Sequence, residues 1–358
     1  MKTKVLLIYN KVWPYRIKIF ELLNEKIDLT VAYSDPSFLD KKYSFKTVYL
    51  PVKAVGPFEF HRNNLFNICS KYDVIVGLFN VRWISVMLLC LNPFRKYSIS
   101  YWGIGVRASY ENKFDSDSRW DKLRFFFAKR AESLIFYSSY PIKKYIQGGI
   151  NKDKLFIANN TTEVDYTGEI DYVRKRNFLF VGTLYAQKGI DVLLAAYLKL
   201  SKFKDNYPCL EIIGDGPEAP KIREFINSNN LHDKIVMHGS IYNPQKLSEI
   251  YKNAIACISP NQAGLSVLTT MGNGTIFVTE KEAITGGEIF SITDKKNGII
   301  YEGGEDELLV KLRWIVENRS ETVEMCKNAL DFYTESRTPG QMADSIYQAI
   351  LFSKNSFS

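Results

Sequence analysis

The sequence predicts an α/β protein with two doubly wound domains, each a parallel sheet with helices on both faces. Short apolar runs rich in β-branched residues alternate with longer amphipathic stretches along the chain. The runs lack the apolar-polar alternation of half-exposed strands, which indicates strands buried on both faces. The same rhythm restarts after residue 176, and 358 residues exceed what one core usually supports. Two domains of ordinary size follow.

The apolar runs give the expected strands in order. In the first half they are residues 4–9, 28–33, 74–78, 97–101 and 133–137. In the second half they are residues 177–182, 210–214, 235–238, 256–259 and 275–279. Residues 162–176 are polar and charged without a strong period, as expected of a linker. Thr338, Pro339 and Gly340 then interrupt the chain before a last amphipathic helix at about residues 342–352.

The composition argues against several classes of protein. The five cysteines are odd in number and form no CxxC pair, so neither a disulfide framework nor a zinc site is expected. The N-terminus has no small-residue cleavage site and is expected to be a buried strand. The longest apolar run, residues 84–91, is far shorter than the roughly 18 residues that span a bilayer. We expect a cytoplasmic protein, either soluble or bound to the inner face of the plasma membrane.

The positive charge is confined to the first half of the chain. Residues 1–170 hold 26 Lys and Arg against 16 Asp and Glu, whereas the rest holds 21 against 23. This asymmetry favours an anionic partner for the first half, such as a membrane leaflet or a phosphorylated acceptor. A well-solvated surface explains the charge equally well. The basic residues form no recognition motif, so nucleic acid is not an expected partner.

Two glycine loops of the second half suggest an anion site. Gly182 and Thr183 follow the strand at residues 177–182, and Lys188 precedes a helix, where a cation and unpaired amides could hold a phosphate. The next strand ends in a tight turn formed by Gly214, Asp215, Gly216 and Pro217. The alternatives are a solvated lysine and an ordinary connection between strand and helix.

A third loop joins a strand end to a helix that is expected to start near Gly264 or Leu265. Glycine allows close approach to the backbone, and the unpaired amides at a helix start favour a diphosphate. Gly264, Leu265 and Ser266 are therefore the predicted phosphate contacts. Close packing of the helix on the sheet would also explain these small residues.

These three loops, in this order, resemble the C-terminal half of retaining glycosyltransferases of family four, which have the GT-B fold. The family pattern runs from Gly-Arg-Leu with Lys-Gly beyond it, through Gly-Asp-Gly-Pro, to a Glu-x7-Glu loop and helix. The matching segments are Gly182 to Gly189, Gly214 to Pro217, and Asn261 to Gly274. The resemblance implies two Rossmann-like domains facing a cleft. The expected domains are residues 1–165 for the acceptor, with 340–358 packing back on them, and 175–338 for the nucleotide-sugar.

The chain departs from the family pattern at three donor positions. The arginine is Thr183 here, and the two glutamates are Asn261 and Thr269. Glu288, in the loop after the next strand, could supply the missing carboxylate, although an exposed loop glutamate is the more ordinary interpretation. We predict catalytic roles for Lys188 and Glu288, and an acceptor site with Arg16, Trp102 and Gly103.

The resemblance also implies a reaction. A nucleoside-diphosphate sugar is the co-substrate, with no other cofactor, and Lys188 with the amides of residues 264–266 neutralises the leaving diphosphate. No metal is expected, since Asp115 and Asp117 lie in a polar loop with no strand before it. The expected acceptor is a glycan or a lipid-linked glycan, as in capsule, O-antigen or exopolysaccharide assembly. A catalytically weakened protein that binds a nucleotide or glycan, and a nucleotide-sugar epimerase of the same fold, are the alternatives.

The segment 119–130 mixes aromatic and basic residues at helical spacing, as at a lipid interface. The same aromatics could be the core face of a helix. We expect residues 125–127 to lie in the core and the basic residues to lie on the surface.

Overall fold

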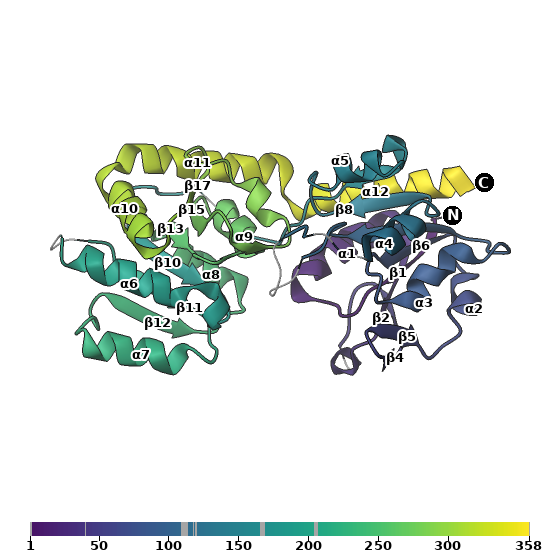
Figure 1. The fold of residues 1–358 in the computed structure, drawn as a ribbon, viewed down its shortest axis with the longest axis horizontal. Helices are drawn as coiled ribbons and strands as arrows, with labels where there is room; N and C mark the ends of the chain where they lie inside the picture. The colour runs from purple at the N-terminus through teal and green to yellow at the C-terminus, as the bar shows by residue number, and fades with distance from the viewer. Residues whose placement is uncertain are drawn as a thin grey trace. The chain divides into compact units, whose positions relative to one another are not determined.

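The computed structural model describes residues 2–39, 41–108, 114–116, 118, 120–164, 169–203 and 207–357. It divides into two compact units, which Figure 1 shows as ribbons. The first unit contains Met1–Arg107, Asp115–Thr161 and Thr338–Ser358. The second contains Ala108–Phe114 and Thr162–Arg337.

The first unit is built on a parallel sheet with the strand order β3-β2-β1-β6-β7-β8-β9. Its strands are β1 (Lys4–Ile8), β2 (Asp28–Tyr33), β3 (Lys46–Tyr49), β6 (Val74–Leu78), β7 (Ser98–Gly103), β8 (Ser133–Phe136) and β9 (Leu155–Ile157). Along the chain, β2 and β3 are added on one side of β1, and β6, β7, β8 and β9 are then added on the other side. An antiparallel pair, β4 (Val52–Val55) with β5 (Phe58–His61), lies outside this sheet and is not among the predicted strands.

Helices cover both faces of the first sheet. The helices are α1 (Pro14–Lys26), η1 (Pro36–Phe38), α2 (Leu65–Cys69), α3 (Ile84–Met87), η2 (Leu88–Leu91), α4 (Trp120–Ala128), α5 (Ile142–Gln147), η3 (Lys152–Lys154) and α12 (Pro339–Phe357). Helices α1 and α12 share one core cluster with β1, while α4 and η2 share another on the opposite face. Both apolar faces of the strands are therefore buried, as the runs without alternation predict.

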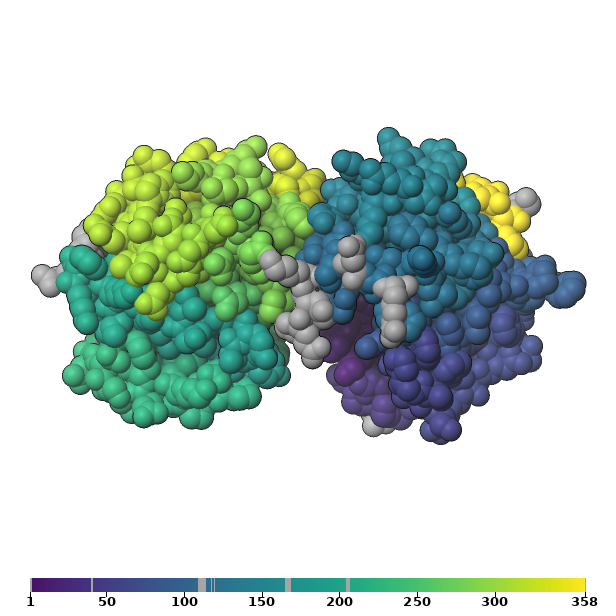
Figure 2. Space-filling view, in the orientation of Figure 1, coloured from purple at the N-terminus to yellow at the C-terminus, as the bar shows by residue number. Residues whose placement is uncertain are grey.

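Helix α12 brings the end of the chain back to the first unit. It packs against α1 and crosses β7, β8 and β9. Ser353 hydrogen-bonds with Ser133 at 2.7 Å and with Ser100 at 2.8 Å, inside the core. Figure 2 shows these last residues, in yellow, among the blue atoms of the first unit. The predicted helix at residues 342–352 is confirmed and is longer than predicted.

The second unit repeats the plan with the parallel strand order β12-β11-β10-β13-β15-β17. Its strands are β10 (Asn177–Val181), β11 (Leu210–Ile213), β12 (Ile235–Gly239), β13 (Ala254–Ile258), β15 (Ile276–Glu280) and β17 (Gly298–Tyr301). A short parallel pair, β14 (Gln262–Ala263) with β16 (Ile284–Thr285), extends from the loops after β13 and β15. The ten predicted strands are confirmed, and so is the predicted α/β fold class.

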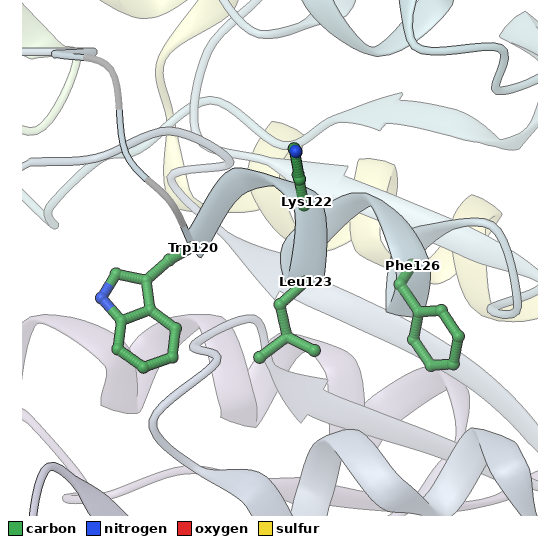
Figure 3. A pocket seen from close by; sticks show the side chains of 4 residues that line it. All are labelled: Trp120, Lys122, Leu123 and Phe126. Carbon is green, nitrogen blue, oxygen red and sulfur yellow. The ribbon is translucent and has the colours of Figure 1, made fainter.

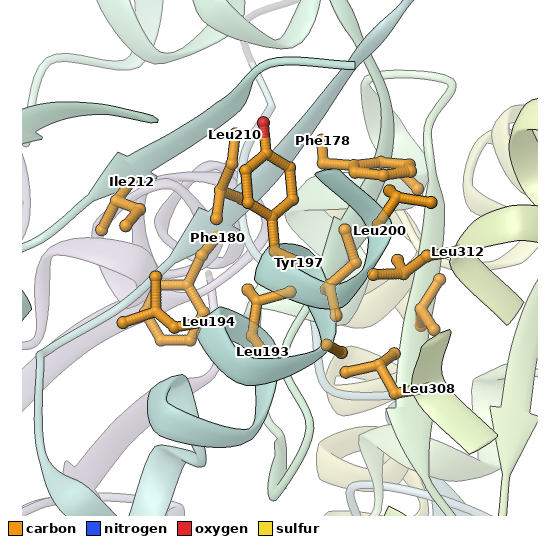
Figure 4. Close-up of a cluster of buried hydrophobic side chains, with 14 of the residues drawn as sticks. Phe178, Phe180, Leu193, Leu194, Tyr197, Leu200, Leu210, Ile212, Leu308 and Leu312 are labelled. Carbon is orange, nitrogen blue, oxygen red and sulfur yellow. The ribbon is translucent and has the colours of Figure 1, made fainter. Parts of the chain in front are cut away.

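Helices cover both faces of this sheet too. They are η4 (Ala186–Lys188), α6 (Ile190–Ser201), α7 (Ala219–Ser228), α8 (Pro244–Tyr251), α9 (Ser266–Gly272), η5 (Glu288–Ser291), α10 (Gly304–Glu317) and α11 (Arg319–Ser336). Figure 4 shows one face, where Leu193 and Tyr197 of α6 and Leu308 and Leu312 of α10 meet Phe178 of β10. Helices α8, α9 and α11 contribute to the core cluster of the opposite face.

The predicted linker at residues 162–176 belongs to the second unit and ends in its core. Lys175 exposes 1% of its surface. Its ammonium donates to the carbonyl oxygens of Tyr251 at 2.7 Å, Asn273 at 2.9 Å and Ala254 at 3.3 Å, and to Thr275 Oγ1 at 2.9 Å. Burial lowers the pKa of Lys175 to about 8. The interpretation of this charged stretch as a simple linker is therefore wrong at Lys175. The Lys175 ammonium is hydrogen-bonded both to the start of β13 and to the segment just before β15.

Candidate functional site

The candidate site lies at the carboxyl edge of the second sheet. The chain starts at β10, adds β11 and β12 on one side, and then adds β13, β15 and β17 on the other. The loops after β10 and β13 diverge at this switch point, which is where doubly wound sheets bind ligands. The loop after β10 contains Gly182, Thr183 and Lys188, and the loop after β13 contains Asn261 and Gly264.

Backbone hydrogen bonds hold the first two loops together. The Leu184 N–H donates to the Asp215 carbonyl at 3.0 Å, and the Glu218 N–H donates to the Leu184 carbonyl at 3.0 Å. Gly214 has a φ of +148°, and a Cβ added there would lie 1.9 Å from the Gly182 carbonyl oxygen. The predicted turn at residues 214–217 thus needs glycine because another backbone passes directly over it.

Gly214→Ala is expected to lower the free energy of unfolding by about 2–4 kcal/mol, because the loops must separate to admit the methyl group. Chemical denaturation measures this loss. Gly239→Ala is the matched control, since Gly239 also has a positive φ of +70° but no atom lies within 4 Å of the added Cβ. Equal losses in the two variants would show that backbone conformation, and not the close contact of the loops, makes Gly214 necessary.

Lys188 ends η4 and lies beside the first loop. A Cβ added at Gly182 would lie 2.8 Å from the Lys188 Nζ, so the ammonium rests against the bare backbone of this glycine. Burial lowers the pKa of Lys188. No carboxylate or hydrogen-bond acceptor contacts this ammonium among the residues that the structure describes. A half-buried cation without a counter-ion is poised to receive an anion.

The third loop is joined to Lys188 by backbone and side-chain contacts. The Asn261 N–H donates to the Lys188 carbonyl at 3.3 Å. A Cβ added at Gly189 would lie 2.6 Å from the Asn261 side chain, and Gly189 has a φ of +70°. Gly189 is a site residue that the prediction misses, although Lys-Gly directly before a helix is a visible signal for it.

Unpaired backbone donors follow Asn261. Helix α9 begins at Ser266 after Leu265, with no side-chain cap. In the described part of the chain, the N–H groups of Gly264, Leu265 and Ser266 donate to no acceptor. A Cβ added at Gly264 would meet no atom within 4 Å, so the space beside this backbone is open. These groups and Lys188 have the chemistry of an anion site.

The remaining predicted donor residues surround these loops. Thr183, Asp215 and Pro217 are exposed, and Gly216 is half-buried. The Asp215 carboxylate accepts the N–H of Gly216 at 2.8 Å. Thr269 lies on α9, where its hydroxyl donates to the Leu265 carbonyl at 3.3 Å. Asn261 and Thr269 therefore bring neutral groups to the positions where the resembled family has acids.

Glu288 is not the exposed loop glutamate of the ordinary interpretation, because it is 7% exposed. Its carboxylate accepts the N–H of Gly286 at 2.9 Å and the hydroxyl of Thr285 at 3.4 Å. The strand pair β14–β16 ties this loop to the third loop, and the Ile284 N–H donates to the Asn261 carbonyl at 2.8 Å. The carboxylate is thus fixed in a loop that is bonded to the candidate site.

The predicted acceptor residues lie at the carboxyl edge of the first sheet, and they are buried. Arg16 and Trp102 each expose 1% of their surface, and Gly103 is buried as well. The guanidinium donates to Asn160 Oδ1 at 2.7 Å and lies 5.0 Å from the ring centres of Trp102 and Tyr137. Arg16 and Trp102 have almost no surface to offer an acceptor directly in this conformation, so their role as acceptor contacts stays a prediction.

The other polar candidates have structural partners. Asp115 pairs with Lys144 at 2.6 Å, and Asp117 lies outside the described residues. His238 pairs with Glu211 at 2.9 Å. His61 hydrogen-bonds with Ser85 at 2.8 Å, and burial lowers its pKa to about 4. Within the described ranges, no group of three or more His, Cys, Asp or Glu side chains is placed to hold a metal ion.

Comparison with known proteins identifies the fold to which this site belongs. Residues 170–331, which include the whole candidate site, match the family described as Glycosyl transferases group 1. HepE of Anabaena, whose structure is a complex with UDP, superposes with a TM-score of 0.71 at 14% identity, covering 97% of this chain and 99% of that one. The fold is that of the GT-B glycosyltransferases.

Two further proteins are similar to this chain, one in structure and one in sequence. A glycosyltransferase from Rickettsia africae superposes with a TM-score of 0.74 at 14% identity, covering 98% of this chain and 99% of that one. An uncharacterized glycosyltransferase of Methanocaldococcus jannaschii is 25% identical over 68% of this chain. The match covers 56% of that relative, so the chain spans little more than half of its length. Together the comparisons show the GT-B fold and a match of residues 170–331 to the group 1 glycosyltransferase family.

Proposed function

We propose that this protein transfers a sugar from a nucleoside-diphosphate sugar to a glycan or lipid-linked acceptor. One observation carries the proposal. Lys188, which has no counter-ion among the described residues, belongs to a loop that is bonded to the third loop, where the N–H groups of residues 264–266 are unpaired. A diphosphate supplies the negative charge and the acceptor oxygens that both groups lack.

The donor nucleotide to test first is UDP. Structures of HepE of Anabaena are described as complexes with UDP, with UDP and glucose, and with UDP-glucose. Those ligands belong to HepE, and the shared GT-B fold supports a nucleotide-sugar as the donor class here. A UDP-sugar is our proposal for this chain, with GDP-, dTDP- and CDP-sugars as the alternatives to be tested beside it.

We propose a retaining, metal-independent reaction. Charge builds on the leaving diphosphate as the glycosidic bond breaks, and fixed donors stabilise that charge without reorganising. Lys188 and the amides of Gly264 to Ser266 supply these donors. Glu288 is the proposed carboxylate near the reacting sugar, because Asn261 and Thr269 are neutral. The setting that we propose is capsule, O-antigen or exopolysaccharide assembly at the cytoplasmic face of the plasma membrane.

Thermal unfolding with UDP, GDP, dTDP and CDP in turn tests the donor site. A ligand at about one hundred times its Kd stabilises the folded protein by roughly 2.7 kcal/mol, which corresponds to a rise of about 4 °C for a chain of this size. We expect a rise with one diphosphate and none with the matching nucleoside. No rise with any diphosphate would reject the proposed site.

A second candidate function is nucleotide binding without turnover, and the neutral Asn261 and Thr269 favour it. Nucleotide release from the corresponding sugar donor, measured with a mixture of glycan and lipid-linked acceptors, distinguishes the two. Diphosphate binding with acceptor-dependent release supports the transferase. Diphosphate binding without release under any of these conditions supports the binding protein.

A further inference from the structure

An apolar hollow lies on the surface of the first unit. Trp120, Leu123 and Phe126 of α4 line it together with Lys122, and its volume is about 490 Å³. Figure 3 shows the three apolar side chains projecting from the same side of the helix. Phe126 is 40% exposed, which corrects the expectation that residues 125–127 all lie in the core. Phe127 is buried, and Phe125 is half-buried.

Cations without carboxylate partners surround this apolar group. Lys122, Phe126 and Arg130 follow one another at four-residue spacing, and the Arg130 guanidinium lies 3.6 Å from the centre of the Phe126 ring. Lys122, Lys129 and Arg130 are exposed, and none of them forms an ion pair within the described ranges. The acid of α4, Asp121, is already bound by Arg124 and Lys144. Unpaired positive side chains thus adjoin the apolar ones along α4.

A second exposed apolar group lies on the neighbouring segment. Leu88 and Leu91 of η2 are 37% and 38% exposed, and Phe94, in the turn that follows, is 87% exposed. Leu89 and Cys90 of η2 share a buried core cluster with Phe127 and Ala128 of α4, so the two segments cover the same face of the sheet. Several large apolar side chains that stay in water on adjacent segments indicate a surface that becomes covered.

We propose that this face, defined as Trp120, Leu123 and Phe126 with Lys122, Lys129 and Arg130, docks on an anionic lipid bilayer. Phe126 is the exposed ring of this face, while Trp120 is half-buried and contacts Phe58 at 5.6 Å between ring centres. An exposed ring enters the boundary between headgroups and acyl chains, while lysine and arginine stay with the lipid phosphates. The net charge of +10 on residues 1–170 attracts this half of the chain toward the same anionic bilayer. The described helices include none with the length and hydropathy of a membrane span, so this contact is peripheral.

This inference deepens the proposed function, because it rests on an enzyme that meets its lipid-linked acceptor at a membrane. Its own observations do not involve the donor site. Vesicle binding is therefore measured without nucleotide or acceptor, and Lys188→Ala is expected to bind vesicles as the unchanged protein does. Absence of transfer by the unchanged protein, with intact vesicle binding, would reject the proposed function alone.

The test is co-sedimentation of the full chain with vesicles of phosphatidylcholine, with or without phosphatidylglycerol. We expect binding to the anionic vesicles, and a decrease as salt shortens the range of the charges. The triple variant Lys122→Glu, Lys129→Glu, Arg130→Glu is expected to bind about 100-fold more weakly. The matched control reverses three exposed lysines of the second unit, Lys202, Lys246 and Lys296, and is expected to bind at nearly the unchanged level.

Two further variants test the apolar part of the contact. Phe126→Ser is expected to weaken binding about 10-fold while leaving its salt dependence intact. Tryptophan fluorescence is expected to shift to the blue on anionic vesicles, and Trp120→Phe is expected to remove most of that shift. No binding to anionic vesicles at low salt would overturn the proposal, and so would equal weakening by the two triple variants.

Discussion

Lys188→Ala is expected to lower the turnover of the nucleotide-sugar donor by about 100- to 1000-fold, the usual cost of removing one fixed donor to a developing negative charge. The same variant is expected to lose the thermal stabilisation by its diphosphate. Its stability without ligand should stay the same or rise slightly, because no partner of Lys188 among the described residues is left unpaired and a half-buried cation is removed. Steady-state nucleotide release and thermal unfolding measure the two effects.

Lys202→Ala is the matched control for Lys188→Ala. Lys202 follows α6 in the same unit and is exposed, without a side-chain partner among the described residues. We expect turnover and diphosphate binding to be unchanged in this control. If Lys188→Ala keeps at least half of the turnover, Lys188 does not contact the leaving group, and the assignment of the diphosphate to this loop is wrong.

Lys175→Met is expected to lower the free energy of unfolding by about 2–4 kcal/mol at neutral pH, since buried acceptors lose their donor. Methionine has a similar length, so the packing volume is nearly kept, but the carbonyls of Tyr251 and Asn273 lose the ammonium. Denaturation with guanidinium chloride measures the loss. Arg174→Met, at an exposed neighbour, is the control and should change stability by less than about 0.5 kcal/mol.

The loss at Lys175 should depend on pH in a defined direction. The pKa of Lys175 is lowered from 10.5 to about 8 by burial, so the folded chain releases this proton before the unfolded chain does. Below about pH 8 the folded and the unfolded chain both hold this proton, so the full free-energy cost of burying the charge applies. Between pH 8 and 10.5 the unfolded state binds more protons, so this residue adds stability as pH rises, by about 3 kcal/mol over the whole range.

The free energy of unfolding, measured at about pH 7.5 and about pH 9.5 on either side of the lowered pKa, checks this direction. The difference between the unchanged protein and Lys175→Met is expected to be larger at the higher pH. A difference that shrinks would mean that the carbonyl contacts hold the proton on Lys175 more strongly than burial disfavours it.

The strands could be predicted because their signal is local. A run such as residues 74–78 has no polar alternation, and burial on both faces follows from the run alone. The tight turn at Gly214 could be predicted for the same reason. The order of the strands could not, because it depends on pairing between distant segments. That order decides which loops become neighbours, and it brings Lys188 next to Asn261.

The misjudged residues are those whose burial depends on distant parts of the chain. Lys175 is one of several charged residues in a polar stretch, and nothing near it in sequence announces the carbonyls of Tyr251 and Asn273. Glu288 looks like an exposed loop acid because nothing near it in sequence shows that β16, just before it, pairs with β14 in the loop after β13. Phe126 is misjudged in the opposite direction, because it is expected in the core and is exposed. Helical spacing shows that residues share a face of the helix, but not whether another element covers that face.

Helix α12 has a consequence for the protein as it is synthesised. Met342, Ile346 and Ile350 complete an apolar core of the first unit, with strands and a helix made more than three hundred residues earlier. Every residue of the second unit leaves the ribosome before α12 does. The second unit can therefore finish folding while the first still lacks part of its core. A nascent chain stalled near residue 337 would display that apolar face to chaperones.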